Sequence, residues 1–268
     1  MLLNNFAFRL LCVLAISVTA AHATIVIALR DGNTIVVGAD SKGVGGEHVC
    51  KVFQHNDTVG GISGASDKGL GFDLPAITRG VVQNEKLNLS DKVKQFFQIA
   101  TDTAKPLLNH TKTTKPQEFD DWVRGRRPVC EVVFATREGG RAIMYLATLR
   151  VSQNGDPLPM KPQESIGPSA GQSPPMRAYD GFSLGESDAA FRSLRSGKLP
   201  ALELIPTVRT LVGIAMKDKP KEIDGPFSIL QLSASSGVTW IERGTCATDP
   251  PKVPAPKKKA APARAKGR

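Results

Sequence analysis

The apolar residues of this chain fall mainly into short runs of the kind that form β-strands. Residues 25–29 and 34–39 are rich in Ile and Val and flank an Asp-Gly pair, a combination typical of a β-hairpin. Similar runs recur along the chain. They predict further strands at residues 52–53, 58–62, 129–135, 142–150, 179–184, 227–232 and 238–241.

Other segments carry apolar residues at the three- and four-residue spacing of a helix. Ser90-Asp91 suits the N-cap of one of them, and Pro106 is expected to kink or end that helix. The polar and basic residues 109–127 are predicted to form a loop, and the Pro-, Gly- and Ser-rich residues 152–177 an irregular excursion. Helices are expected at residues 70–82, from 90 to 106, at 188–194 and at 202–216.

The predicted order is strands, two helices, strands, two helices and strands. A four-layer αββα sandwich satisfies this order, because it is an α+β fold in which two antiparallel sheets are flanked by helices. One domain is expected over residues 24–248, which is long enough for a sizeable core. The apolar fraction of 41% is typical of a globular protein.

The first 23 residues have the pattern of a secretory signal peptide. Residues 6–20 are mostly apolar with Arg9 as their only charge, and Ala21-His22-Ala23 is a small-residue cleavage signature. The apolar run is shorter than the roughly 20 residues that span a bilayer, although a retained N-terminal anchor remains the alternative. Cleavage would place the protein in the periplasm or outside the cell, and would leave Thr24 with a hydroxyl and a free α-amine.

The net charge of +10 comes largely from the C-terminal end. After Asp249 the chain has seven Lys and Arg residues and no acid, set among Pro and Ala. Residues 249–268 are expected to form a disordered basic tail, because this composition cannot bury enough apolar surface to offset its ordering entropy. The tail either holds the protein on an anionic surface or is a solvated segment without a partner, and no specific nucleic-acid site is predicted.

Cysteine and histidine usage indicates no metal site and no cofactor. The three cysteines after the signal peptide are Cys50, Cys130 and Cys246, so that one disulfide is compatible with an oxidising compartment but its partners are not determined by the sequence. Their spacing fits no zinc pattern, and no two histidines have ligand spacing.

Four segments near residue 24 resemble, in order, the start of a proteasome β-type subunit, a family of N-terminal nucleophile (Ntn) hydrolases. Thr24-Ile25-Val26-Ile27 resembles the mature N-terminus with its threonine nucleophile. Gly38-Ala39-Asp40-Ser41-Lys42 resembles the family's Ala-Asp-Ser-Arg element, at the family's distance from the threonine. Lys51-Val52-Phe53 resembles the strand with the active-site lysine, and the sequence GGISGASD at residues 60–67 resembles the small-residue turn that follows.

This resemblance implies a threonine-type peptidase or amidohydrolase that cleaves peptide or other small amide substrates. Thr24 would be the nucleophile and its own α-amine the base. Lys51 would keep that amine neutral by charge repulsion, Asp40 would hold Lys51, and the Gly64 N–H would stabilise the oxyanion. The resemblance leaves open whether subunits associate into a homo-oligomer.

The chain departs from the family pattern at three places. The family's Gly-Ser-Gly turn, whose serine supports the terminal amine, is matched here by Gly185-Glu186-Ser187, so that Ser187 would act from one position further on. Acids near the last hairpin, Asp218 and Asp224, match the family's aspartate only after a shift. Ala23 replaces the glycine that precedes the threonine in self-processing members, which suits removal by signal peptidase instead.

Two other functions remain open. Gly181-Phe182-Ser183-Leu184-Gly185 matches the Gly-x-Ser-x-Gly nucleophile elbow, but that fold needs a histidine later in the chain, and none follows His110. The other alternative is a catalytically inactive Ntn-like envelope protein that binds an anionic partner through its basic tail. No transmembrane segment is expected after signal cleavage.

Overall fold

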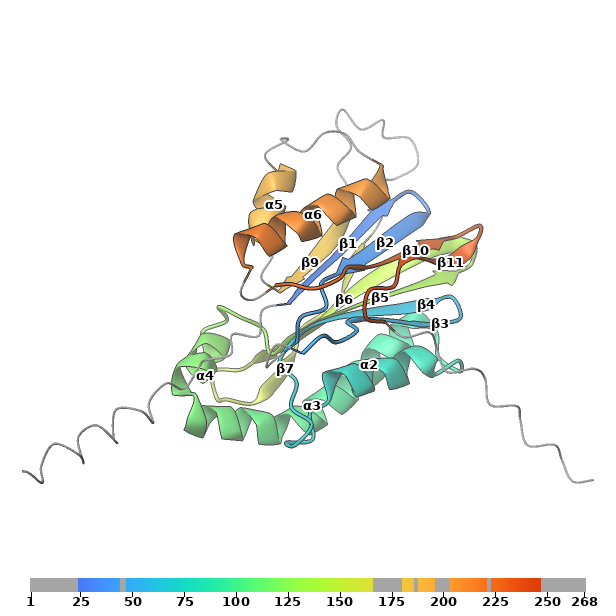
Figure 1. Ribbon diagram of the computed structural model, residues 1–268. Coiled ribbons are helices and arrows are strands. Elements are labelled where there is room, and N and C mark those ends of the chain that lie inside the picture. The colour runs from blue at the N-terminus through green and yellow to red at the C-terminus, as the bar shows by residue number, and fades with distance from the viewer. Residues whose placement is uncertain are drawn as a thin grey trace, which may run out of the picture.

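The computed structural model describes residues 24–43, 47–165, 180–185, 188–195, 203–220 and 223–246. Within these ranges the protein is a mixed α/β structure with two antiparallel sheets and helices on their outer faces (Figure 1). The expected signal peptide, the basic tail and Ser187 lie outside the described residues.

The first sheet is built from strands taken from both ends of the described chain. Its β1–β2 hairpin is the one that the Asp-Gly pair predicts, with a turn at Gly32-Asn33. The last hairpin pairs with β2, and β9 pairs with β1. In spatial order the strands are β11 (Gly237–Glu242), β10 (Ser228–Ser233), β2 (Thr34–Ala39), β1 (Ile25–Asp31) and β9 (Asp180–Gly185).

In the second sheet β3 to β7 are neighbours in chain order, with hairpins from β3 to β4 and from β5 to β6 and three helices between β4 and β5. Its strands are longer than the apolar runs predicted, because pairing continues into flanking residues such as Gly64 and Glu138. Two short strands in the stretch expected to be irregular, β7 and β8, both pair with β6. The strands are β3 (Val52–His55), β4 (Thr58–Gly64), β5 (Cys130–Glu138), β6 (Arg141–Val151), β7 (Pro157–Pro159) and β8 (Gln163–Ser165).

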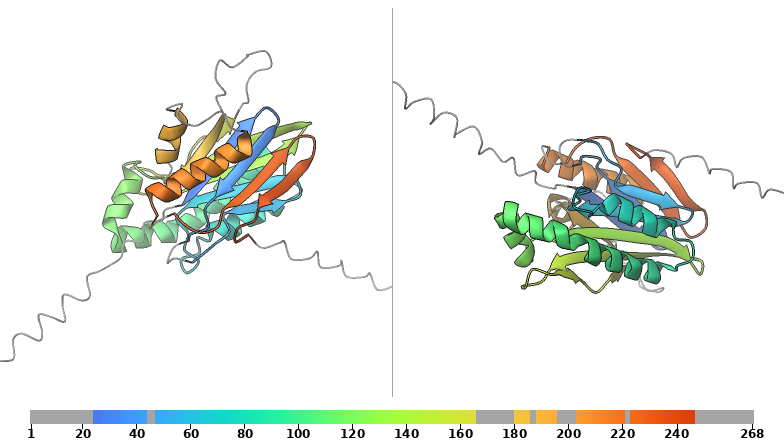
Figure 2. Two further views of the ribbon diagram at one scale, coloured as in Figure 1. Left: turned by 45° about the horizontal axis from the view of Figure 1, so that its top comes forward. Right: turned by 90° about the horizontal axis from the view of Figure 1, so that it is seen from below.

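The helices lie on the two outer sides of the paired sheets, and the views in Figures 1 and 2 both show this. α5 (Asp188–Arg195) and α6 (Leu204–Asp218) cover the first sheet. α2 (Leu74–Gln83), α3 (Leu89–Thr114) and α4 (Pro116–Val123) lie against the second.

Alternation along the strands divides the core into three apolar clusters. On β1, Ile25 and Ile27 pack toward α6, whereas Val26 and Ala28 pack toward the second sheet. This two-sided burial explains why residues 25–29 form an uninterrupted apolar run. The third cluster lies between the second sheet and α2, α3 and α4.

The expected end of the second helix at Pro106 is wrong. α3 continues through Pro106 to Thr114. A proline removes one intrahelical hydrogen bond and crowds the preceding turn, but Leu107 and Leu108 beyond it are buried in the cluster under the second sheet. Burial of these two leucines therefore stabilises the helix beyond the proline.

Two further expectations need correction. The predicted loop at residues 109–127 instead contains the end of α3 and α4, and Trp122 anchors α4 in the same cluster. The first helix begins at Leu74 rather than at residue 70, because the Asp73 side chain accepts the N–H of Ala76 and caps it.

Among the described residues, every helix is too short or too polar to cross a lipid bilayer.

Lys92 of α3 is a buried lysine that closes the end of α2. Its Nζ donates to the carbonyl oxygens of Val81 at 3.1 Å and of Val82 at 3.0 Å, and also to that of Asn84. Val81 and Val82 belong to the last turn of α2, Asn84 is its C-cap, and the Val81 carbonyl also accepts the N–H of Asn84 at 3.2 Å. The ammonium group therefore joins α2 to α3.

We expect Lys92→Met to lower the free energy of unfolding by about 1–3 kcal/mol, because it removes the buried ammonium group that donates to three carbonyl oxygens at the end of α2. Lys94→Met is the matched control, since Lys94 lies two residues along the same helix in an exposed pair with Asp91, and it should change stability by less than about 0.5 kcal/mol. Urea denaturation of both variants measures the difference. Equal effects would show that Lys92 contributes no more than a surface lysine.

Candidate active site

Thr24 lies immediately before β1 and is 9% exposed. Ile25 directs both of its backbone polar groups toward β2: its N–H donates to Asp40 Oδ1 at 3.0 Å, and its carbonyl accepts the Asp40 N–H at 3.4 Å. Successive residues of a strand point these groups to opposite sides. The carbonyl of Thr24 instead faces β9, where its oxygen lies against Gly185.

Asp40 and Lys51 form a fully buried ion pair between the two sheets. Lys51 Nζ lies 2.8 Å from Asp40 Oδ1 and 2.9 Å from Oδ2, and the two residues are 3% and 0% exposed. Asp40 follows β2 of the first sheet, and Lys51 precedes β3 of the second. The Asp40 carboxylate also accepts the N–H of Lys42 at 3.1 Å, so that two backbone N–H groups donate to it in addition to its charged partner.

Burial dominates the ionisation of this pair. It raises the pKa of the Asp40 carboxyl, while Lys51 and the N–H groups of Ile25 and Lys42 act in the opposite direction. It likewise lowers the pKa of the Lys51 ammonium, which Asp40 acts to raise. Each charge is therefore stabilised by the other and by the backbone rather than by water.

Gly64 ends β4 beside this pair, in a conformation that requires glycine. Its φ is +121°, and a Cβ at this position would lie 2.5 Å from both the Cα of Cys130 and the carbonyl oxygen of Val129. Neither of these neighbours is a side chain that can move aside. Ser63, the preceding residue, is buried, and its Oγ lies against Gly185 of the first sheet.

The structure brings together most of the residues that the sequence singled out. Asp40 and Lys51 are in direct contact, and Asp40 is bonded to the residue that follows Thr24. Gly64 lies one residue from Ser63, which approaches the Thr24–Gly185 pair from the second sheet. Ser187 is not among the described residues, so that its predicted role stays a prediction.

Two features next to the site were not predicted. The first is a disulfide between Cys50 and Cys246, with 4.6 Å between their Cα atoms, which leaves Cys130 as a free, buried cysteine. This disulfide ties the residue before Lys51 to the segment after β11. The second is Glu131, whose Oε2 accepts the N–H of Gly185 at 3.3 Å. The sequence feature that could have indicated Glu131 is its acidic side chain within the otherwise apolar run 129–135.

Ser183 does not lie at a nucleophile elbow. It sits within β9, in register with Ile27, on the face toward the helices rather than on a turn. Its Oγ is buried and has no hydrogen-bond partner among the described residues. His48 instead contacts Ser41 and His55 contacts Glu85, while His110 belongs to α3.

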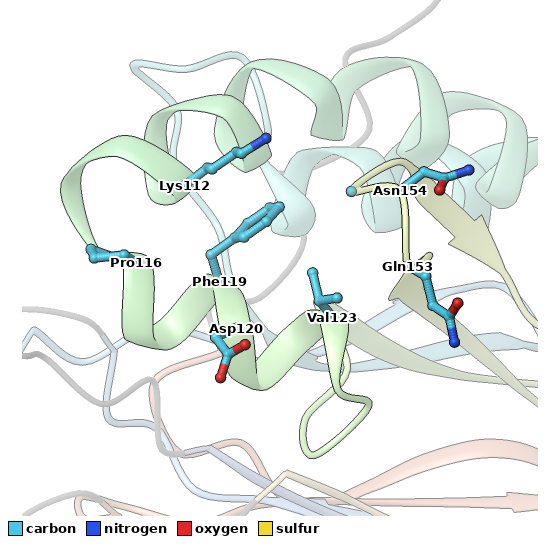
Figure 3. A pocket seen from close by; sticks show the side chains of 8 residues that line it. Lys112, Pro116, Phe119, Asp120, Val123, Gln153 and Asn154 are labelled. Carbon is cyan, nitrogen blue, oxygen red and sulfur yellow. The ribbon is translucent and has the colours of Figure 1, made fainter.

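A pocket of about 410 Å³ lies away from these residues, between α4 and the turn that joins β6 to β7 (Figure 3). Phe119 and Val123 of α4 form one side, and Gln153 and Asn154 form the other. Lys112 of α3 covers the ring of Phe119 with its ammonium 5.8 Å from the ring centroid. None of the predicted site residues lines this pocket.

Comparison with known proteins adds no assignment to this geometry. No protein-family model matches the sequence, and no curated protein matches it either. Within the described residues, no group of three or more His, Cys, Asp or Glu side chains is placed to hold a metal ion.

We expect a double-mutant cycle to reveal strong coupling between Asp40 and Lys51. Lys51→Met alone, or Asp40→Asn alone, should lower the free energy of unfolding by about 3–5 kcal/mol, because each leaves a buried charge unpaired. The Asp40→Asn, Lys51→Met double variant removes both charges and keeps an oxygen acceptor for the Ile25 N–H, so it should be more stable than either single variant. Denaturant unfolding of all four proteins gives the coupling.

The exposed pair of Asp91 and Lys94 provides the matched control cycle. Its coupling should be about 0.2–1 kcal/mol or less. Additive losses at Asp40 and Lys51 would mean that the two charges are not held together as the geometry indicates.

Proposed function

We propose that this protein is an exported, proteasome-like threonine hydrolase with a four-layer Ntn fold, in which removal of residues 1–23 exposes Thr24 as the nucleophile. The observation that carries the proposal is the buried Asp40 carboxylate, which is bonded both to Lys51 and to the backbone of the residue after Thr24. A buried lysine, linked through Asp40 to the residue that follows a threonine which cleavage would make N-terminal, supports this chemistry.

The proposed reaction begins with the hydroxyl of Thr24. As Oγ attacks the carbonyl carbon of an amide, its proton passes to the α-amine of the same residue. A terminal amine has a pKa of about 7.7–8.0, so that part of it is neutral near neutral pH. The positive charge of Lys51 disfavours a second cation nearby and increases that fraction, while Asp40 keeps Lys51 charged and in place.

The tetrahedral intermediate carries a negative oxygen, for which the N–H of Gly64 is the proposed donor. The ammonium of Thr24 then returns its proton to the leaving amine, and an ester between substrate and Thr24 remains. Water, deprotonated by the same amine, attacks this ester; the bond to Oγ breaks, the ammonium returns the proton to Oγ, and the acid is released. The required substrate is therefore a peptide or another amide.

The disulfide supports the exported location in this proposal. Disulfides persist in oxidising compartments and are rare in the cytosol. Cys50 and Cys246 lie far apart in sequence, and their bond fixes the chain directly before Lys51. A periplasmic or extracellular protein would keep this constraint.

The second candidate is a catalytically inactive protein of the same fold, held on an anionic surface by residues 249–268. The altered turn Gly185-Glu186-Ser187 favours it, because the family's supporting serine is displaced. Hydrolysis of a panel of fluorogenic peptides and amides by the correctly processed protein separates the two candidates.

We expect the exported protein to begin at Thr24. Intact-mass measurement of protein recovered from the periplasm or medium should give the mass of residues 24–268 with one disulfide. Ala21-His22-Ala23 motivates this start. A chain that begins at any other residue would exclude Thr24 as an N-terminal nucleophile.

The chemistry predicts a specific set of variants. Thr24→Ala should abolish hydrolysis and Thr24→Ser should retain part of it. Lys51→Ala should reduce kcat by roughly 10²–10⁴-fold, the range typical of a lost acid–base contribution. Ser183→Ala is the control, and it should leave the rate unchanged because no described histidine contacts that serine.

A protein made in the cytosol with Ala21-His22-Ala23 still attached provides the sharpest comparison. Its Thr24 nitrogen is an amide, which has no basic lone pair to accept a proton. It should fold and be inactive. Equal turnover by the extended and the trimmed protein would mean that the terminal amine is not the base.

A further inference from the structure

Glu131 is an acid placed in the interface between the two sheets. On β5 it shares a face with Val133 and Ala135, which belong to the apolar cluster between the sheets. Its cross-strand neighbours are Ser63 on β4 and Thr148 on β6. The apolar interface thus ends in a row of three polar side chains at the end where β1 begins.

The carboxylate of Glu131 reaches across to the first sheet. Its Oε2 accepts the N–H of Gly185, and Gly185 is paired in register with Ile25. A side chain at position 185 would overlap the carbonyl of Thr24. Glu131 therefore holds the strand end that lies directly against Thr24.

The start of β1 lies between this acid and Asp40. Ile25 turns its N–H and carbonyl toward β2 and Asp40, whereas the carbonyl of Thr24 lies against Gly185 of β9. β9 is the strand that Glu131 contacts. Asp40 with its lysine thus lies on the β2 side of this strand end, and Glu131 lies on the β9 side.

The groups around Glu131 stabilise its negative charge less than burial destabilises it. Burial raises the pKa of its carboxyl, against the effects of the Gly185 N–H, Arg150 and Thr148. Arg150 also donates to the carbonyl of Gly125. Among the residues that the structure describes, the charged groups around this end of the interface include Asp40 and Lys51 on the β2–β3 side, and Glu131 and Arg150 on the β5–β6 side.

We propose that Glu131 is a positioning residue of the Thr24 site, which fixes the end of β9 and stabilises the ammonium form of the Thr24 amine when that amine takes the hydroxyl proton. Its catalytic part rests on the proposed function. A carboxylate beside a nascent cation lowers the energy of that cation without itself taking the proton, as an acid does for the imidazolium of a serine hydrolase triad.

The expected sign follows from the charge. A nearby anion favours the ammonium form and raises the pKa of an amine, so that its removal lowers that pKa. In Glu131→Gln the side-chain oxygen still accepts the Gly185 N–H, and only the negative charge is lost. The titration midpoint of the Thr24 amine should therefore fall by roughly 0.5–1 pH unit, as expected for a charge several ångströms away in a partly buried site.

The test is an NMR titration of [13C]threonine-labelled protein that begins at Thr24, with the Thr24 signal assigned by its loss in Thr24→Ser. It needs no turnover, so its outcome is independent of whether a substrate is found. Glu131→Gln should shift the midpoint downward, and Glu131→Asp, which keeps the charge, should stay close to the unmodified protein. An unchanged midpoint in Glu131→Gln overturns the proposal.

Glu138→Gln is the matched control, because Glu138 lies at the far end of the same strand and contacts Leu89 of α3 instead. Its Thr24 midpoint should not move, and an equal shift in this variant would also overturn the proposal. With an amide substrate in hand, Glu131→Gln should reduce kcat and extend the acidic limb of the pH–rate profile to lower pH. If the wild-type protein is inactive but Glu131→Gln still lowers the midpoint of the Thr24 amine, the hydrolase proposal is wrong and the electrostatic role of Glu131 is retained.

Discussion

The buried pair of Asp40 and Lys51 joins the two sheets at the end where β1 begins. Neither residue is in contact with bulk water, so each charge depends on the other, and the carboxylate depends further on the N–H groups of Ile25 and Lys42. A buried carboxylate with this many donors has little freedom to move without losing one of them. The start of β1, the end of β2 and the start of β3 are therefore held in a single arrangement.

A second connection between the sheets lies on the other side of Thr24. Glu131 of β5 accepts the N–H of Gly185 of β9, just as Asp40 of the first sheet accepts from Lys51 of the second. The disulfide of Cys50 and Cys246 adds a covalent constraint next to Lys51. Near these links the apolar interface gives way to polar side chains where Thr24 lies, and at the far end of β1 the buried Arg30 donates to the carbonyl of Ser165 in the other sheet.

This arrangement matches the needs of a reaction in which nucleophile and base belong to one residue. Such a residue must be held firmly without a side-chain base to orient it, and here its neighbour Ile25 is bonded to Asp40 on one side while its own carbonyl lies against Gly185 on the other. In the proposed mechanism processing decides the chemistry, since an amide nitrogen becomes a basic amine only when the preceding residue is removed.

Local patterns in the sequence determined the hairpins and most of the helices, because turn chemistry and apolar periodicity act over a few residues. Thr24, Asp40 and Lys51 became candidates through the cleavage signature before Thr24 and the resemblance of the segments around them to a known family. The tertiary structure decided what depends on residues far apart in the chain. α3 passes Pro106 because Leu107 and Leu108 are buried under a distant sheet. Cys50 pairs with Cys246, and Glu131 meets Gly185, only once the two sheets stack. No local pattern encodes these contacts, since their energy comes from burial and charge pairing across the sheet interface.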